Sequence, residues 1–149
     1  MLSLPDHLRR ELVGLWSLVT VLRQLTTPSA KGRFLTAALG DRPYLAKYLR
    51  ATYGPHKYHI HPACVAFGGQ PPEGDRLELL QILNRARVAG GVELEQQFIH
   101  FLRRTPNEMK ELVLGILERD LRCGIDARLI DNAFLPTGLA PLDATNPAE

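Results

Sequence analysis

The sequence predicts an all-α fold: one compact domain of about seven helices, with one short extended connector. Apolar residues recur at the i, i+3, i+4, i+7 spacing of a buried helix face over most of the chain. Pro, Gly and Asp residues separate these periodic segments, as they do where helices end and turns begin. The 149 residues have room for one domain that buries a real core.

The first two helices are expected over about residues 6–25 and from Ser29 to just before Gly40. We expect Asp6 and Ser29 to be their N-caps. Pro28 should end the first helix, because proline cannot donate the next helical hydrogen bond. The buried faces are formed by residues three or four apart: Leu8, Leu12, Leu15, Trp16, Val19 and Leu22 in the first helix, and Phe34, Leu35 and Ala38 in the second.

A third helix is expected to begin at Asp41, which caps it, with Pro43 in the tolerated first turn. It should stop at Tyr53-Gly54-Pro55. The irregular part of the chain follows over residues 56–74. Residues 56–62 alternate in an extended manner, and Gly68-Gly69 with Pro71-Pro72 indicate a loop.

Three longer helical patterns come next. The first starts at Asp75 and breaks at Gly90-Gly91, and the second covers residues 92–104. The third starts at Thr105, which has the capping-box spacing with proline in the first helical turn. We expect it to end at Gly124, since glycine adopts the left-handed conformation after a helix most easily.

A short last helix should run from an Asp126 cap to Phe134. From Leu135 onward, Pro, Gly, Asn and Ala occur without periodicity. The sequence therefore predicts an all-helical domain over residues 1–136 and a tail or linker over 137–149.

The charge is unevenly distributed along the chain. The net charge is +2, but residues 1–57 carry +6 and residues 58–149 carry −4. Such a gradient suggests a region that faces a polyanion. Uneven but solvated surface charge is an equally good interpretation of this feature alone.

The remaining composition is that of a soluble globular protein. No apolar stretch approaches the roughly 20 residues of a membrane span, and residues 1–6 lack the pattern of a secretion signal. Cys64 and Cys123 lie far apart and outside any CxxC pair, which is typical of free thiols in a reducing compartment. We expect a cytoplasmic protein without a membrane partner. No heptad seam is present, so we also expect a monomer.

A histidine-rich segment is the most tempting metal site. It contains His56, His59, His61 and Cys64. A zinc site needs about four such ligands in tetrahedral arrangement, but a second short-spaced pair elsewhere in the chain is missing. We therefore predict no metal site and favour surface histidines near a phosphate path. No GxSxG, HExxH, P-loop or GxGxxG motif is present, and no catalytic residue is predicted.

Basic residues near expected helix ends are the best binding candidates. Lys31 and Arg33 lie in the first turn of the second helix, where the helix dipole repels cations and attracts phosphate. Arg119, Arg122 and Arg128 surround the Gly124 turn, where arginines and backbone amides can approach a nucleic-acid backbone. An equally good interpretation is that Arg119 and Arg122 only cap carbonyls at the end of a helix.

Two segments resemble a known family. Residues 111–134 are similar to the closing hairpin of the N-terminal DNA-binding domain of ATP-dependent DNA ligases. In that family a helix ends in an RDLR-x-G type sequence, and this chain has Arg119-Asp-Leu-Arg-Cys-Gly124 within the range. Residues 53–60 look like that family's Y-x-P-x-x-x-Y/F-x-I connector. The order and spacing of the helices agree over residues 1–136, and the likeness is greatest to phage ligases.

The resemblance implies a function. The family's domain is all-α and contacts the minor groove on both sides of a nick, mainly through phosphates and sugars. It therefore implies sequence-independent binding of double-stranded or nicked DNA, in a bacterial or phage-infected cell, to position a ligase in replication, repair or recombination. The DNA-backbone contacts that it implies are Lys31, Arg33, Lys57, Arg119, Arg122, Gly124 and Arg128.

The chain departs from the family in one respect. Ligase catalysis needs a nucleotidyltransferase domain with a K-x-D-G lysine, and none of Lys31, Lys47, Lys57 and Lys110 is followed by x-Asp-Gly. We therefore expect no enzyme activity and no cofactor in this domain. ATP and Mg²⁺ would belong to an absent catalytic domain, which acts in cis if the chain is part of a longer ligase or in trans if it is a separate protein.

Two other functions stay open from the sequence. One is a helical protein-interaction module that has kept the fold but not DNA binding, which an exposed apolar patch in place of a basic one would indicate. The other, which we rank lowest, is an enzyme with an unrecognised site.

Overall fold

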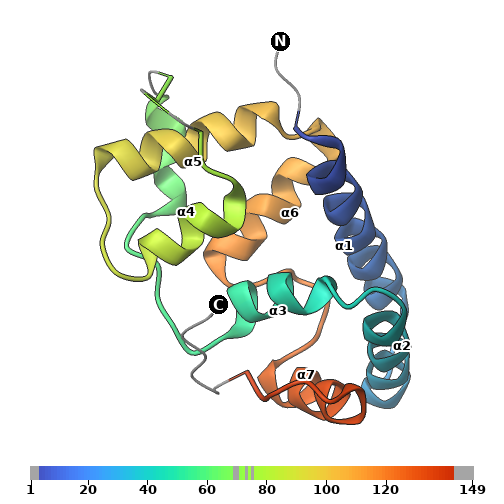
Figure 1. Cartoon of the computed structure of the whole chain (residues 1–149). Helices are drawn as coiled ribbons and strands as arrows, with labels where there is room; N and C mark the ends of the chain where they lie inside the picture. The colour runs from blue at the N-terminus through green and yellow to red at the C-terminus, as the bar shows by residue number, and fades with distance from the viewer. Residues whose placement is uncertain (1–3, 69–70, 73, 75, 143–149) are drawn as a thin grey trace.

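A computed structural model describes residues 4–68, 71–72, 74 and 76–142, and these residues contain helices and no strand (Figure 1). The all-α prediction is confirmed. The helices in chain order are α1 (Asp6–Gln24), α2 (Pro28–Asp41), α3 (Leu45–Tyr53), the 3-10 helix η1 (Pro62–Phe67), α4 (Leu79–Ala86), α5 (Val92–Arg104), α6 (Asn107–Glu118), α7 (Ala127–Phe134) and the 3-10 helix η2 (Leu135–Thr137).

One core joins all these helices. Helix α1 packs against α2, α3 and α6, while α4 pairs with α5 and α2 pairs with α7. In Figure 1, α1 and α2 lie along one edge, α4 and α5 lie at the opposite edge, and α7 closes the bottom of the molecule. The largest fully buried side chains are Tyr48, Phe98, Phe101 and Phe134 with a set of leucines. The described residues therefore form one compact domain.

The starts of the first three helices differ from the prediction. Pro5, not Asp6, is the N-cap of α1. Thr27, not Ser29, caps α2, because its hydroxyl accepts a hydrogen bond from the Ala30 amide at 3.1 Å. Pro28 is then the first helical residue, where its missing N–H costs nothing. Helix α2 also runs through Gly40 to Asp41, so Asp41 caps no helix.

The later boundaries are partly as predicted. Helix α5 has the predicted range, and the Asp126 carboxylate caps α7 by accepting from the Leu129 amide at 2.9 Å. The capping box predicted at Thr105 does not form, since its hydroxyl donates to the Phe101 carbonyl instead. A capping box forms at Glu78, where α4 begins, four residues later than expected. Asp75 and Gly69, used in the predictions for this region, lie outside the described residues.

The end of α6 is a correction with consequences for the site. The helix ends at Glu118, and Arg119, not Gly124, is its left-handed C-cap, with φ of 66°. Gly124 also has a positive φ, of 72°, but it lies within the turn that leads to α7. The left-handed conformation costs free energy for a residue that has a Cβ atom. Contacts made by the turn must offset this cost at Arg119.

The segment after α7 packs on the domain as far as it is described. Leu142 is buried, and its amide donates to the Asp131 carboxylate at 2.7 Å. The Arg50 guanidinium donates to the Ala140 and Pro141 carbonyls and lies 4.9 Å above the Phe134 ring. Residues 137–142 of the predicted tail thus contact α3 and α7, while residues 143–149 lie outside the described residues.

Two glycines within helices should respond oppositely to alanine. A Cβ atom on Gly32 would meet nothing within 4 Å, so Gly32→Ala should stabilise the protein by about 0.5–1 kcal/mol through helix propensity. A Cβ atom on Gly115 would lie 2.9 Å from the Asp120 carbonyl oxygen, so Gly115→Ala should destabilise it by about 1–3 kcal/mol. Urea unfolding measures the change in the free energy of unfolding for each variant. A change of the same sign in both variants would contradict the packing described for α6.

Candidate nucleic-acid interface

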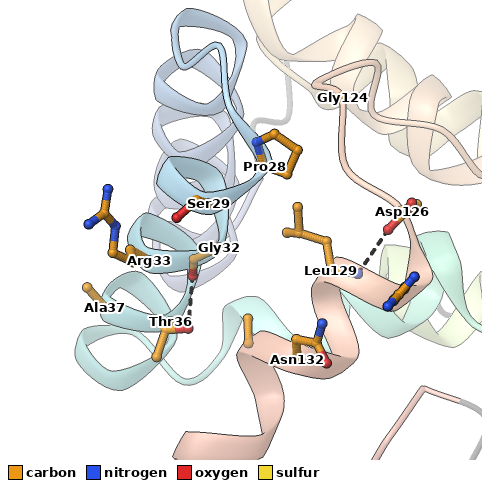
Figure 2. A pocket seen from close by; sticks show the side chains of 12 residues that line it. Pro28, Ser29, Gly32, Arg33, Thr36, Ala37, Gly124, Asp126, Leu129 and Asn132 are labelled. Carbon is orange, nitrogen blue, oxygen red and sulfur yellow. Dashed lines mark hydrogen bonds between the residues drawn. The ribbon is translucent and has the colours of Figure 1, made fainter.

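A surface groove lies between α2 and α7, the two helices with the most extensive mutual contact among the described residues (Figure 2). Its volume is about 830 Å³. We call it the α2–α7 groove. It is lined by Pro28, Ser29, Gly32, Arg33, Thr36, Ala37, Gly124, Asp126, Arg128, Leu129, Asn132 and Ala133.

The groove carries an excess of positive charge. Arg33 on α2 and Arg128 on α7 are both exposed, and no Asp or Glu of the described residues forms an ion pair with either. Asp126 is the one acidic residue of the lining, and its carboxylate is engaged as the cap of α7 (Figure 2). Two arginines without a carboxylate partner therefore border the same groove from different helices.

The rest of the lining is small and weakly polar. Gly32, Ala37 and Ala133 present little side-chain bulk, and Thr36 donates its hydroxyl proton to the Gly32 carbonyl at 2.9 Å (Figure 2). Such a surface allows a sugar–phosphate strand to approach closely. Its uncharged polar side chains are Ser29, Thr36 and Asn132.

Lys31 joins α2 to the turn at one end of the groove. Its ammonium group donates to the Cys123 carbonyl at 3.1 Å and to the Gly124 carbonyl at 3.3 Å. The turn, residues 119–126, is thereby fixed against the start of α2. Because the acceptors are neutral carbonyls, the positive charge of Lys31 is not cancelled.

Two more side chains hold the same turn. Arg23, in the last turn of α1, donates to the Leu121 and Arg122 carbonyls at 3.2 Å each. The Tyr53 hydroxyl accepts from the Leu121 amide at 3.1 Å. Arg23 was not among the predicted site residues, and no sequence signal marks it, because it reaches a turn nearly 100 positions later in the chain.

The three arginines of the predicted hairpin have different positions. Arg119 is half-buried and donates to the Gly54 carbonyl, and its Nε is buried without a hydrogen-bond partner among the described residues. Arg122 is exposed and forms an ion pair with Glu118 at 3.5 Å. Arg128 alone lines the groove. The structure thus gives Arg119 an internal role, and its contact with DNA stays a prediction.

Lys57 is not near the other predicted residues. It is exposed on the connector, the segment of residues 54–61 that follows α3. In Figure 1 this segment leaves the end of α3 that faces away from α2 and runs toward α4. The structure therefore gathers Lys31, Arg33, Gly124 and Arg128 at the α2–α7 groove, with Arg122 on the adjoining turn, and leaves Lys57 elsewhere.

The histidine segment does not gather its members around one point. His56 lies 3.1 Å from the Tyr58 hydroxyl through its Nε2, and His61 accepts from the Ala63 amide through its Nδ1. Cys64 is buried, and burial raises the pKa of its thiol. Within the described ranges no three His, Cys, Asp or Glu side chains form a group that could hold a metal ion.

Comparison of the chain with known protein families, with characterised proteins and with solved structures yields no match. Within the part of the chain that the structure describes, no helix combines the length and the apolar character needed to cross a bilayer. The assignment of a function therefore depends on the geometry of the groove and on the two sequence motifs.

The Lys31 contacts predict a difference between two substitutions. Lys31→Met removes the ammonium donors and should lower the free energy of unfolding by about 1 kcal/mol. Lys31→Gln keeps an N–H donor near the turn and should cost less. Urea unfolding of the two variants tests this, and equal stability of both variants and the unchanged protein would show that the turn does not depend on Lys31.

Proposed function

We propose that this chain binds double-stranded DNA independently of sequence, through the sugar–phosphate backbone, at the α2–α7 groove and the adjoining turn. The observation that carries the proposal is the pair Arg33 and Arg128, which border one groove from two helices without a carboxylate partner among the described residues. Two such guanidinium groups bind phosphate oxygens through charge-assisted hydrogen bonds.

The surroundings of this pair support the same ligand. Lys31 and Arg23 add two positive charges at the turn, and both are bound to carbonyls rather than carboxylates. The Lys31 ammonium lies against Gly124, in the place that a Cβ atom would take, so a phosphate that approaches the turn there meets this charge. Contacts of this kind fix the position of a duplex but do not read its sequence.

We further propose that the chain positions the catalytic domain of an ATP-dependent DNA ligase on nicked DNA. The support is the resemblance of residues 53–60 and 111–134 to that family. In the fold, these two segments contact each other: Arg119 donates to the Gly54 carbonyl, and the Leu121 amide donates to the Tyr53 hydroxyl. The residues that carry the likeness therefore lie together behind the turn.

A protein-interaction module is the alternative. Its mark would be one exposed apolar face, but the large exposed apolar side chains of the described residues are divided among three segments. They are Val13 and Trp16 on α1, Val88 just before α5 with Val92 as the first residue of α5, and Leu135 at the start of η2. This division favours the DNA-binding proposal over a single protein-docking face.

Binding to DNA should depend steeply on salt. With about four to six phosphate contacts, the slope of log K against log salt should be about −4 to −5 on duplexes of random sequence. The double variant Arg33→Gln/Arg128→Gln should reduce the magnitude of this slope by about two, with little change in stability. Fluorescence anisotropy between about 50 and 200 mM salt measures it.

A matched pair of variants locates the contact. Gly32→Glu places a carboxylate in the groove and should weaken binding more than Gly40→Glu, which places the same group on the same helix outside the lining. A Cβ atom at either position would meet nothing within 4 Å, so neither substitution causes a clash, and urea unfolding of both variants confirms that each is folded. Equal binding by both variants, or a flat salt response of the unchanged protein, would overturn the assignment to this groove.

The ligase part of the proposal has its own test. Fusion of the chain to a ligase nucleotidyltransferase fragment that lacks a DNA-binding domain should increase the rate of nick sealing at low DNA concentration. The fusion with Arg33→Gln/Arg128→Gln should lose that increase, because the added binding is lost. If the chain binds DNA but the fusion seals nicks no faster than the fragment alone, the role in ligation is wrong while DNA binding stands.

A further inference from the structure

A second cationic surface lies between α4 and α5. The tip of the α4–α5 hairpin, residues 87–92, is exposed along its whole length. Val88 is 82% exposed and Val92 is 70% exposed, the highest values among the valines of the described residues. Apolar side chains this exposed gain free energy when a partner covers them.

Contacts with the connector fix this tip in place. The His59 amide donates to the Ala86 carbonyl at 2.7 Å, at the end of α4. Gly90 lies so close to the connector that a Cβ atom there would be 2.1 Å from the His59 carbonyl oxygen. The tip and the connector therefore form one surface, and the exposed Lys57 belongs to it.

The surface is positively charged. Lys57, Arg85 and Arg87 are exposed, and none of them forms an ion pair with a described carboxylate. Two acidic residues, Glu93 and Glu95, follow the tip in the first turn of α5. Burial lowers the pKa of His56 on the connector, and the charges of Arg87 and Arg119 lower it further.

Arg119 also connects this surface to the turn beside the groove. Its guanidinium donates to the carbonyl of Gly54, at the start of the connector, while its own backbone begins the turn. A continuous series of contacts thus leads from Lys31 and the turn, through Arg119 and the connector, to Ala86 and Gly90 at the tip.

We propose that the α4–α5 tip and Lys57 form a second contact with the same DNA duplex, with Arg87 and Lys57 on phosphates and Val88 and Val92 against sugars of the minor groove. This proposal rests on the proposed function. It makes the binding surface two-part, so that the protein holds a longer stretch of duplex than the α2–α7 groove alone.

The combination of charge and shape favours DNA as the occupant. Arginine and lysine around two short apolar side chains match a minor groove, whose walls are the two sugar–phosphate backbones with apolar deoxyribose atoms exposed on them. Ala89, Gly90 and Gly91 add almost no side-chain bulk between the valines, which lets the tip enter a narrow groove. Continuity with the turn beside the α2–α7 groove supplies the second argument.

The test compares three double variants by anisotropy on random duplexes of increasing length. Lys57→Gln/Arg87→Gln should reduce the salt slope by about two on long duplexes and change it little on the shortest duplex that still binds. The control Arg10→Gln/Lys110→Gln removes the same charge from the N-terminal parts of α1 and α6 and should leave the slope unchanged. Val88→Ser/Val92→Ser should weaken binding several-fold on long duplexes without changing the slope, because it removes apolar contact and no charge.

The outcomes separate this inference from the proposed function. If Arg33→Gln/Arg128→Gln lowers the slope and Lys57→Gln/Arg87→Gln does not, the second contact is wrong and the groove stands. If only Lys57→Gln/Arg87→Gln lowers it, the tip binds DNA and the groove does not.

A second experiment measures binding to phosphatidylserine vesicles. If Lys57→Gln/Arg87→Gln abolishes this binding and leaves DNA binding unaffected, the tip belongs to a lipid surface and the inference is overturned. Absence of DNA binding by the unchanged protein overturns both.

Discussion

The turn between α6 and α7 is held by hydrogen bonds from three other helices, and the α2–α7 groove depends on them. Arg23 of α1 and Lys31 of α2 donate to its carbonyls, and the Tyr53 hydroxyl at the end of α3 accepts one of its amides. These contacts offset the left-handed conformations of Arg119 and Arg122, which non-glycine residues rarely adopt. They fix the turn at the end of the groove, while direct packing between α2 and α7 forms its walls.

The way these cations are anchored also sets the charge of the surface. A lysine or arginine that is held by a carboxylate contributes little field beyond the pair, whereas one held by carbonyls keeps its full charge. Lys31 and Arg23 belong to the second kind. A fold with a net charge of only +2 can therefore present a locally positive surface, since its acidic residues are not paired with these cations.

Local signals in the sequence predicted what is decided locally. The range of α5 and the Asp126 cap follow from periodicity and side-chain chemistry, and both are confirmed. The end of α6 could not be predicted this way, since Gly124 is the better left-handed residue. Arg119 takes that conformation in a turn where its guanidinium donates to the Gly54 carbonyl and the Asp120 amide donates to the Gly115 carbonyl. The place of Arg23 in the site depends on packing between distant segments, for which one sequence carries no signal.

The two arginines of the motif at positions 119 and 122 therefore serve different ends. Both have positive φ, but Arg119 turns inward to the Gly54 carbonyl while Arg122 stays exposed beside Glu118. The inward arginine joins the turn to the connector, and the connector in turn holds the α4–α5 tip through His59. Arg119, which the ligase resemblance predicts to contact DNA, thus also sets the relative position of two cationic surfaces, so we expect a change at Arg119 to shift these surfaces even if its guanidinium touches no phosphate.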